Sequence, residues 1–158
     1  MRNEDADEQA IRALIGTHFD ALKWEPGTAA DWGTFAQDFL CDASLFPAAR
    51  PVQAKTLDAF IERMKGVAQS TLRTFEERTL GMKMLAFGNV DVVLAASEML
   101  ENGTDVNHDV SAYLLVKDQG RWRIAAHAWD HATEQNPVPE DLRSRFLSVH
   151  AKRGETLN

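Results

Sequence analysis

Histidine and aspartate side chains are the groups in this chain best suited to acid–base chemistry, since an imidazole exchanges protons near neutral pH. His18 is the one polar member of an apolar stripe in a predicted helix, and His127 lies in an apolar predicted strand. Asp42 follows a predicted helix, where a carboxylate can act as a base or cap backbone amides. These three are the candidate catalytic residues; for each histidine the alternative is a hydrogen-bonded core residue. A His18–His127 pair would suit the proton transfer of a dehydratase or cyclase.

The spacing of potential metal ligands gives no support for a metal or a cofactor. His127 and His131 are four residues apart, which is about 13 Å along a strand and too far for one shared ion. The chain has no glycine-rich phosphate loop, zinc-ligand spacing or nucleophile elbow. The lone cysteine, Cys41, is expected to be packed and inert. We therefore predict no metal and no cofactor.

The charge balance narrows the classes of partner. The 158 residues carry a formal net charge of -7 with a pI near 5.2, whereas a nucleic-acid groove or an anionic membrane surface would require a basic patch. Hydrophobic residues make up 44% of the chain, as in an ordinary soluble domain. No apolar run is long enough for a transmembrane helix, and the acidic N-terminus lacks a secretory apolar region. We expect a cytoplasmic protein that binds neither nucleic acid nor membrane.

Residues 74–133 contain His127, and their pattern predicts a four-stranded antiparallel meander. Three turn signals divide this stretch: Gly88-Asn89, Asn102-Gly103 and Asp118-Gln119-Gly120. Gly, Asn and Asp tolerate the positive φ angles that tight hairpins need. The runs between the turns are rich in Val, Leu, Met, Ala and aromatic residues, which is typical of strands.

The chain before the meander reads as three helices and one short strand. Apolar periodicity predicts helices over Asp5–Trp24 and Thr28–Leu40, a strand over Cys41–Phe46, and a third helix capped by Thr56. Helices followed by strands indicate an α+β domain whose helices cover one face of the sheet. We assign this domain to residues 1–135, and residues 136–158 to a C-terminal extension with a short helix over Glu140–Lys152.

The last hairpin decides which side chains share a face with His127. If Asp118 pairs with Arg121, a regular ladder puts Ala112 opposite His127 and Val110 opposite Trp129. One face then carries Val110, Ala112, Leu114, Ala125, His127 and Trp129, and the other carries Tyr113, Leu115, Trp122, Ile124, Ala126 and Ala128. Both faces are apolar, so we expect helices on one and a second subunit on the other, a homodimer through the sheet face. A slip of one residue would re-pair these faces.

The element order, together with the passages AADWGTFAQDFLCDASLF and LLVKDQGRWRIAAHAW, resembles the nuclear transport factor 2-like superfamily, which includes ketosteroid isomerase and SnoaL-type cyclases. This resemblance implies a cone-shaped, strongly bent antiparallel sheet wrapped around three N-terminal helices, a cystatin-like fold. It also implies a pocket inside the cone and a dimer through the convex face. Superfamilies of this kind mix enzymes with binding modules, so the fold leaves the function open.

Matching the hairpin to ketosteroid isomerase places His127 and Trp129 on the pocket wall and Ala112 where that enzyme has its oxyanion-stabilising acid. His18 falls near the isomerase tyrosine, and Phe46-Pro47 replaces the general-base aspartate, so the resemblance excludes steroid isomerisation. The predicted ligand-binding residues are Trp129, Ala112, Val110, Leu114, Phe46 and Glu98, although Glu98 could instead point outward at an edge. We expect a SnoaL-like pocket protein for a small apolar molecule, with cofactor-free acid–base catalysis of isomerase, dehydratase or cyclase type. The alternative is a non-catalytic dimeric module that binds a ligand or a protein.

Overall fold

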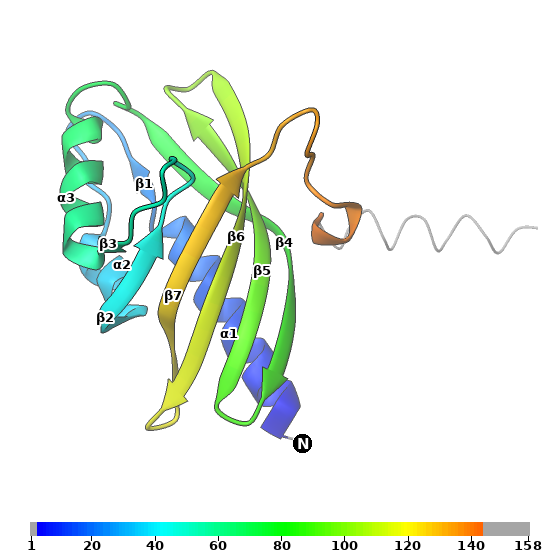
Figure 1. The fold of residues 1–158 in the computed structure, drawn as a ribbon. Coiled ribbons are helices and arrows are strands. Elements are labelled where there is room, and N and C mark those ends of the chain that lie inside the picture. The colour runs from blue at the N-terminus through cyan, green and yellow to red at the C-terminus, as the bar shows by residue number, and fades with distance from the viewer. Residues whose placement is uncertain (1–2, 144–158) are drawn as a thin grey trace, which may run out of the picture.

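The structure of the chain is a computed structural model that describes residues 3–143. Figure 1 shows long strands sweeping past helix α1, with helix α3 beside them. The elements are, in chain order, α1 (Asn3–Asp20), β1 (Lys23–Trp24), α2 (Trp32–Gln37), β2 (Phe39–Phe46), β3 (Lys55–Thr56), α3 (Leu57–Ala68), β4 (Phe75–Phe87), β5 (Val90–Glu101), β6 (Asp105–Asp118), β7 (Arg121–His131) and the 3-10 turn η1 (Glu140–Leu142). The predicted α+β class with three N-terminal helices is confirmed.

Strands β4 to β7 form the predicted meander. Asn102 and Gly103 have φ angles of 51° and 76°, and Gln119 and Gly120 have 50° and 74°. Two successive positive φ angles define the turn that matches the twist of antiparallel strands. The predicted pairing of Asp118 with Arg121 across the last turn is also confirmed.

The sheet has seven strands in the order β1-β4-β5-β6-β7-β2-β3. It is mixed rather than purely antiparallel as predicted, because β2 lies parallel to β7 and pairs Leu45 with His127. The second helix, α2, is also shorter than the sequence predicts. Its N-cap is Asp31, which accepts from the Thr34 backbone N–H, and the chain from Phe39 onward joins the sheet instead.

Two β-bulges bend the sheet around the helices. One lies in β4 between Thr79 and Gly81, and the other leaves Ala125 without a partner on β6, since Leu115 pairs with Ile124 and Leu114 with Ala126. A bulge adds one residue to one strand, so it bends that strand and exchanges its two faces beyond that point. The concave face then carries the core, in which Ile11, Ile15 and Phe19 of α1 are buried.

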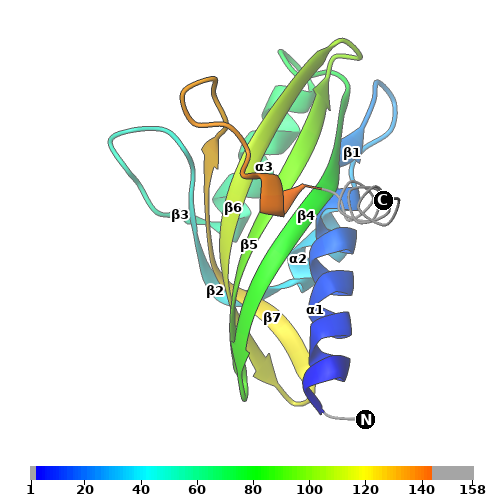
Figure 2. The ribbon, with the colours of Figure 1, turned by 90° about the vertical axis from the view of Figure 1, so that its right-hand side faces the viewer.

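The convex face is partly covered by the chain after β7. Val138 and Leu142 are buried there against Ala96 and neighbouring residues, and Figure 2 shows this segment crossing the outer face of the sheet. Gly81 allows the close approach, because a Cβ atom at this position would lie 2.6 Å from the Leu142 carbonyl oxygen. Of the helix predicted over Glu140–Lys152, only the turn Glu140–Leu142 is described, and residues 144–158 lie outside the described part of the chain.

No helix among residues 3–143 is long and apolar enough to cross a membrane.

Candidate functional site

A cavity of about 200 Å³ opens on the concave side of the sheet. Its wall consists of residues from α1, α2, α3, β1 and strands β4 to β7, together with residues of two connecting segments. The lining residues are His18, Phe19, Leu22, Trp24, Phe35, Phe60, Met64, Leu72, Phe75, Glu77, Met99, Glu101, Asp109, Ser111, His127, Trp129 and His131. Most of this wall is apolar, and the polar side chains gather on β4 to β7.

His127 is the most unusual side chain of the cavity wall. It is only 8% exposed, and neither ring nitrogen has a hydrogen-bond partner among the described residues. The ring stacks on Tyr113 with centroids 4.1 Å apart and contacts Trp129 at 4.7 Å. Burial, and secondarily the proximity of His18, hold the pKa of His127 well below its usual value of 6.5. A neutral imidazole with one free donor and one free acceptor therefore borders the cavity.

His18 forms a buried pair with Asp38. Its Nδ1 lies 3.3 Å from the Asp38 carboxylate, and its ring stacks on Phe35 at 4.6 Å. A carboxylate on Nδ1 favours the tautomer that carries its proton there, which leaves Nε2 free to accept one. The rings of His18 and His127 are 6.1 Å apart, so one small ligand can contact both.

Carboxyl groups from β4, β5 and β6 line one end of the cavity. Ser97 donates to Glu77 at 2.8 Å, and Asp109 lies 2.6 Å from Nδ1 of His131. Burial raises the pKa of Glu77 to about 8, and the neighbouring Asp109 adds to the shift. Burial also raises the pKa of Asp109, against the opposing hydrogen bond from His131. Glu77 is therefore mostly protonated at neutral pH.

Tyr113 adds a phenol behind His127. The side chain is fully buried, and its Oη has no hydrogen-bond partner among the described residues. Burial, with the nearby Glu77 carboxyl, raises the pKa of Tyr113 above its usual value. The phenol is therefore neutral at ordinary pH.

Of the residues predicted from the sequence, His18, His127 and Trp129 line the cavity. The expectation that Ala112, Val110 and Leu114 share their face is wrong. The bulge at Ala125 brings Tyr113 opposite His127 and Ser111 opposite Trp129. Since side chains alternate along β6, Val110, Ala112 and Leu114 point to the convex side.

The remaining predicted residues also lie outside the cavity. Phe46 pairs with Ala128, one position beyond the buried Leu45 and on the opposite face. Asp42 is exposed on β2 and is not part of the cavity wall. Glu98 faces outward, where it pairs with Arg78 at 2.7 Å and His108 at 2.9 Å. These two contacts, His108 first, lower the pKa of Glu98.

Sequence reasoning missed several polar residues of the concave side, among them Asp38, Glu77, Asp109 and Tyr113. Asp38 lies within the predicted helix over residues 28–40, and nothing in the sequence distinguishes Glu77, which lines the cavity, from Glu76, which does not. The alternation of β6 would have placed Asp109, Ser111 and Tyr113 together, but only the bulge joins that face to His127.

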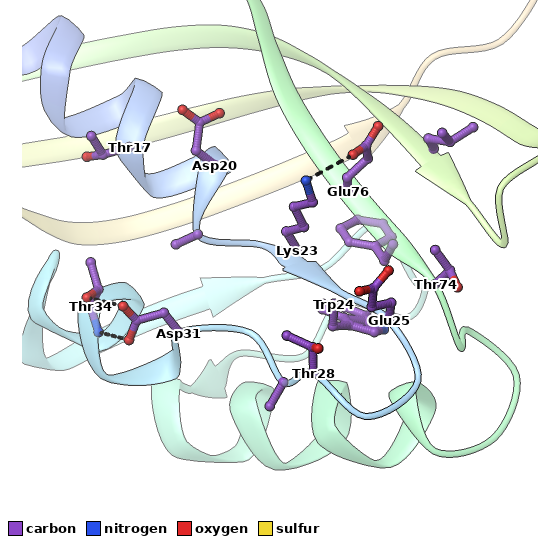
Figure 3. Close-up of a pocket in the computed structure, with 14 residues that line it drawn as sticks. Thr17, Asp20, Lys23, Trp24, Glu25, Thr28, Asp31, Thr34, Thr74 and Glu76 are labelled. Atoms are coloured by element: carbon purple, nitrogen blue, oxygen red, sulfur yellow. Dashed lines mark hydrogen bonds and ion pairs between the residues drawn. The ribbon is translucent and has the colours of Figure 1, made fainter.

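A wider groove of about 710 Å³ lies outside the cone, at the end of α1 and along β1. Figure 3 shows its exposed polar side chains, including the ion pair between Lys23 and Glu76 and the Asp31 cap on Thr34. None of the buried, unpartnered polar atoms found in residues 3–143 belongs to this groove. Within the same residues, no group of three or more His, Cys, Asp or Glu side chains could hold a metal ion.

No protein-family model and no curated protein sequence matches the chain. Solved structures do match it. An NTF2-like protein of unknown function from Pseudomonas putida superposes with a TM-score of 0.66 at 16% identity, covering 88% of this chain and 97% of that one. A cystatin-like protein of unknown function from Nostoc punctiforme gives a TM-score of 0.63 at 11% identity, with 82% and 93% covered.

A third structure, a hexachlorocyclohexane dehydrochlorinase from Novosphingobium barchaimii, gives a TM-score of 0.64 at 12% identity and covers 82% of this chain and 89% of that one. Identities this low establish the fold alone. The chain has the nuclear transport factor 2-like, or cystatin-like, fold, as its resemblance to that superfamily predicted.

Proposed function

We propose that the protein binds a small, largely apolar molecule in the cone and catalyses a cofactor-free proton transfer on it. The observation that carries this proposal is His127, a buried imidazole whose two nitrogens find no partner among the described residues. Leaving such a group unpaired costs about 1–3 kcal/mol. A ligand that hydrogen-bonds to His127 would recover this free energy, so the site is organised for an occupant.

The neighbouring groups supply the chemistry. His18 takes up a proton at Nε2 while Asp38, 3.3 Å from Nδ1, stabilises the imidazolium that forms. His127 donates its N–H to the ligand oxygen that gains negative charge, which is effective because the site is shielded from water. The result is abstraction of a proton next to a carbonyl or a leaving group, as in an isomerisation or an elimination.

The cavity volume and the fold comparison both favour a small substrate. About 200 Å³ lies below the roughly 300–1,000 Å³ of sites for drug-sized ligands. One solved structure with this fold is, by its name, a dehydrochlorinase of hexachlorocyclohexane. That name describes an elimination from a compact apolar molecule, the reaction type proposed here.

The outer sheet face supports the proposal of a homodimer. Leu85 and Phe87 are 80% and 86% exposed, and Val90, Val92, Leu94 and Leu114 are exposed on the same face. A contiguous apolar patch of this kind is typical of an interaction surface. The same observation favours the second candidate function, a non-catalytic module that uses the patch to bind a partner.

Native mass spectrometry, followed by solvent extraction, will identify a small molecule that co-purifies with the protein. Turnover of that compound is then compared in wild type, His18→Ala and His127→Ala. We expect each substitution to lower kcat by about 10²-fold or more, the usual contribution of a general acid or base. Unchanged turnover in both variants would contradict catalysis at this site and favour the interaction module.

A further inference from the structure

The cavity wall contains several carboxyl groups, and histidine is the only basic residue type among its described residues. Glu77, Glu101 and Asp109 contribute carboxyl groups, and no lysine or arginine belongs to the described cavity wall. His131, which pairs with Asp109, is the only imidazole at this end. The nearest arginine on β4, Arg78, instead pairs with Glu98 on the outer face. The carboxyl groups therefore have no fixed cation of their own among the cavity residues.

Aromatic rings complete the wall around these carboxyl groups. Trp24 stacks on Phe75 with centroids 4.7 Å apart, and Phe60 meets Trp129 edge-on at 5.7 Å. All four rings line the cavity. The face of an aromatic ring attracts a cation, most strongly where water is excluded. Rings combined with carboxyl groups form a typical environment for an organic ammonium ion.

His127 is a second, independent sign of a ligand at the same place. It is buried, unpartnered and neutral, so a polar group of a bound ligand would satisfy it. A metal ion is not suited to these residues, since within residues 3–143 no three side chains of the metal-binding types converge.

Resting on the cavity function proposed above, we infer that the ligand is a compact apolar amine. Its body packs among the aromatic rings, and its protonated nitrogen lies at the Glu77–Asp109 end. This assignment narrows the substrate class from any apolar molecule to one that carries a basic nitrogen.

Binding of a protonated amine should release a proton from the protein, which binding of a neutral molecule should not do. The titratable groups that face Glu77 inside the cone are Asp109, Glu101, Tyr113, His18, His127 and His131. Without a ligand, burial and Asp109 raise the pKa of Glu77 to about 8. A cation bound beside Glu77 stabilises the carboxylate form of its side chain. Binding near pH 7 therefore releases a proton from Glu77. Affinity consequently rises as the pH approaches 8.

The test is isothermal titration calorimetry with matched pairs of probes: benzylamine with benzyl alcohol, phenethylamine with phenethyl alcohol, and cyclohexylmethylamine with cyclohexylmethanol. We expect each amine to bind about tenfold or more tightly than its alcohol, as a desolvated cation among rings and carboxylates would. Titrations in buffers of different ionisation enthalpy should show that amine binding releases a proton at pH 7.

Substitutions test the contribution of each carboxyl group to amine binding. Glu77→Gln and Asp109→Asn should each weaken amine binding about tenfold and weaken alcohol binding much less. Glu98→Gln, on the outer face, should change neither. Alcohols that bind as tightly as the amines would overturn the amine assignment and leave the cavity proposal standing. If no probe binds, both are overturned.

Discussion

The imidazole of His127 lies parallel to the phenol of Tyr113, with ring centroids 4.1 Å apart and an interplanar angle of 14°. Their polar atoms, Nδ1 and Nε2 of one and Oη of the other, are buried without partners among the described residues. Stacking keeps the two rings in place, while their hydrogen-bonding capacity stays unused. A ligand in the neighbouring cavity would use that of His127, which lines it, and the cost of the unpaired imidazole can be measured.

Replacing His127 by leucine should stabilise the protein while removing ligand binding. The substitution exchanges an unpaired polar group for an apolar one of similar size, so we expect the free energy of unfolding to rise by about 1 kcal/mol. Urea unfolding at pH 7 measures it. His108→Leu, on the outer face, is the control, and its effect should stay within about 1 kcal/mol because its pair with Glu98 is partly exposed. A large loss of stability in His127→Leu would contradict this account of the ring.

The same variant should differ from wild type in its response to acid. The pKa of His127 is lower in the folded protein than its usual 6.5, so below pH 6.5 the unfolded chain binds a proton that the folded protein does not. Wild type therefore loses stability as the pH falls below 6.5, by at most about 1.4 kcal/mol per pH unit. His127→Leu should lack this contribution in unfolding measured at pH 5, 6 and 7. Parallel pH dependences in the two proteins would refute the prediction.

Removing Asp38 should destabilise the protein through His18. His18 is only 1% exposed, so Asp38→Ala leaves its Nδ1 buried without a partner, at a cost of about 1–3 kcal/mol. Asp42→Ala is the control, because Asp42 is close to Asp38 in the chain but exposed on β2, and it should change stability by less than about 0.5 kcal/mol. Chemical denaturation of both variants gives the comparison. Equal effects would show that the Asp38 pair contributes nothing.

Glu77 should make stability fall as the pH rises. Its pKa is about 8 in the folded protein and 4.5 as a free side chain. Between these values the folded protein binds a proton that the unfolded chain has lost. Its contribution is complete below pH 4.5 and disappears as the pH rises through 8, with a slope of up to about 1.4 kcal/mol per pH unit. Glu77→Gln should remove this slope in unfolding followed from pH 5 to 8, and identical slopes would show that Glu77 titrates normally.

The apolar outer face should hold two copies of the chain together. Leu85→Lys places a charge in the exposed patch and should convert a dimer to a monomer in sedimentation equilibrium. Val106→Lys is the control, since Val106 is also exposed on this face but lies eight residues along β6 from Leu114. A monomeric wild type, or a dimer that survives Leu85→Lys, would rule out this interface.

The sequence predicts the fold more completely than it predicts the site. The turns at Asn102-Gly103 and Gln119-Gly120 have positive φ angles, which few residue types adopt. The local sequence therefore predicts the hairpins and the Asp118–Arg121 pairing. It does not predict the bulge at Ala125, because nothing in RIAAHAW distinguishes the extra residue from its neighbours. That one residue moved Ala112 away from the predicted cavity and put Tyr113 opposite His127 on the concave face.

Contacts between residues far apart in the sequence explain other differences between the predicted and the observed site. Asp38 meets His18 only because β2 joins β7 in parallel, and a crossover of this kind leaves no local signal. Phe46 and Asp42 lie outside the cavity because Ala43 and Leu45 are the residues that this part of β2 buries. Residue types suited to acid–base chemistry were identified at His18 and His127, but their partners depend on the tertiary structure.

Ligand-observed NMR with a panel of small apolar ketones, alcohols and amines tests the central claim most directly. The protein samples are wild type, His127→Leu and the control His108→Leu. We predict that compounds bind wild type and His108→Leu alike, and that His127→Leu loses this binding while remaining folded. The claim is contradicted if no compound binds wild type, or if the compounds that do so bind His127→Leu equally well.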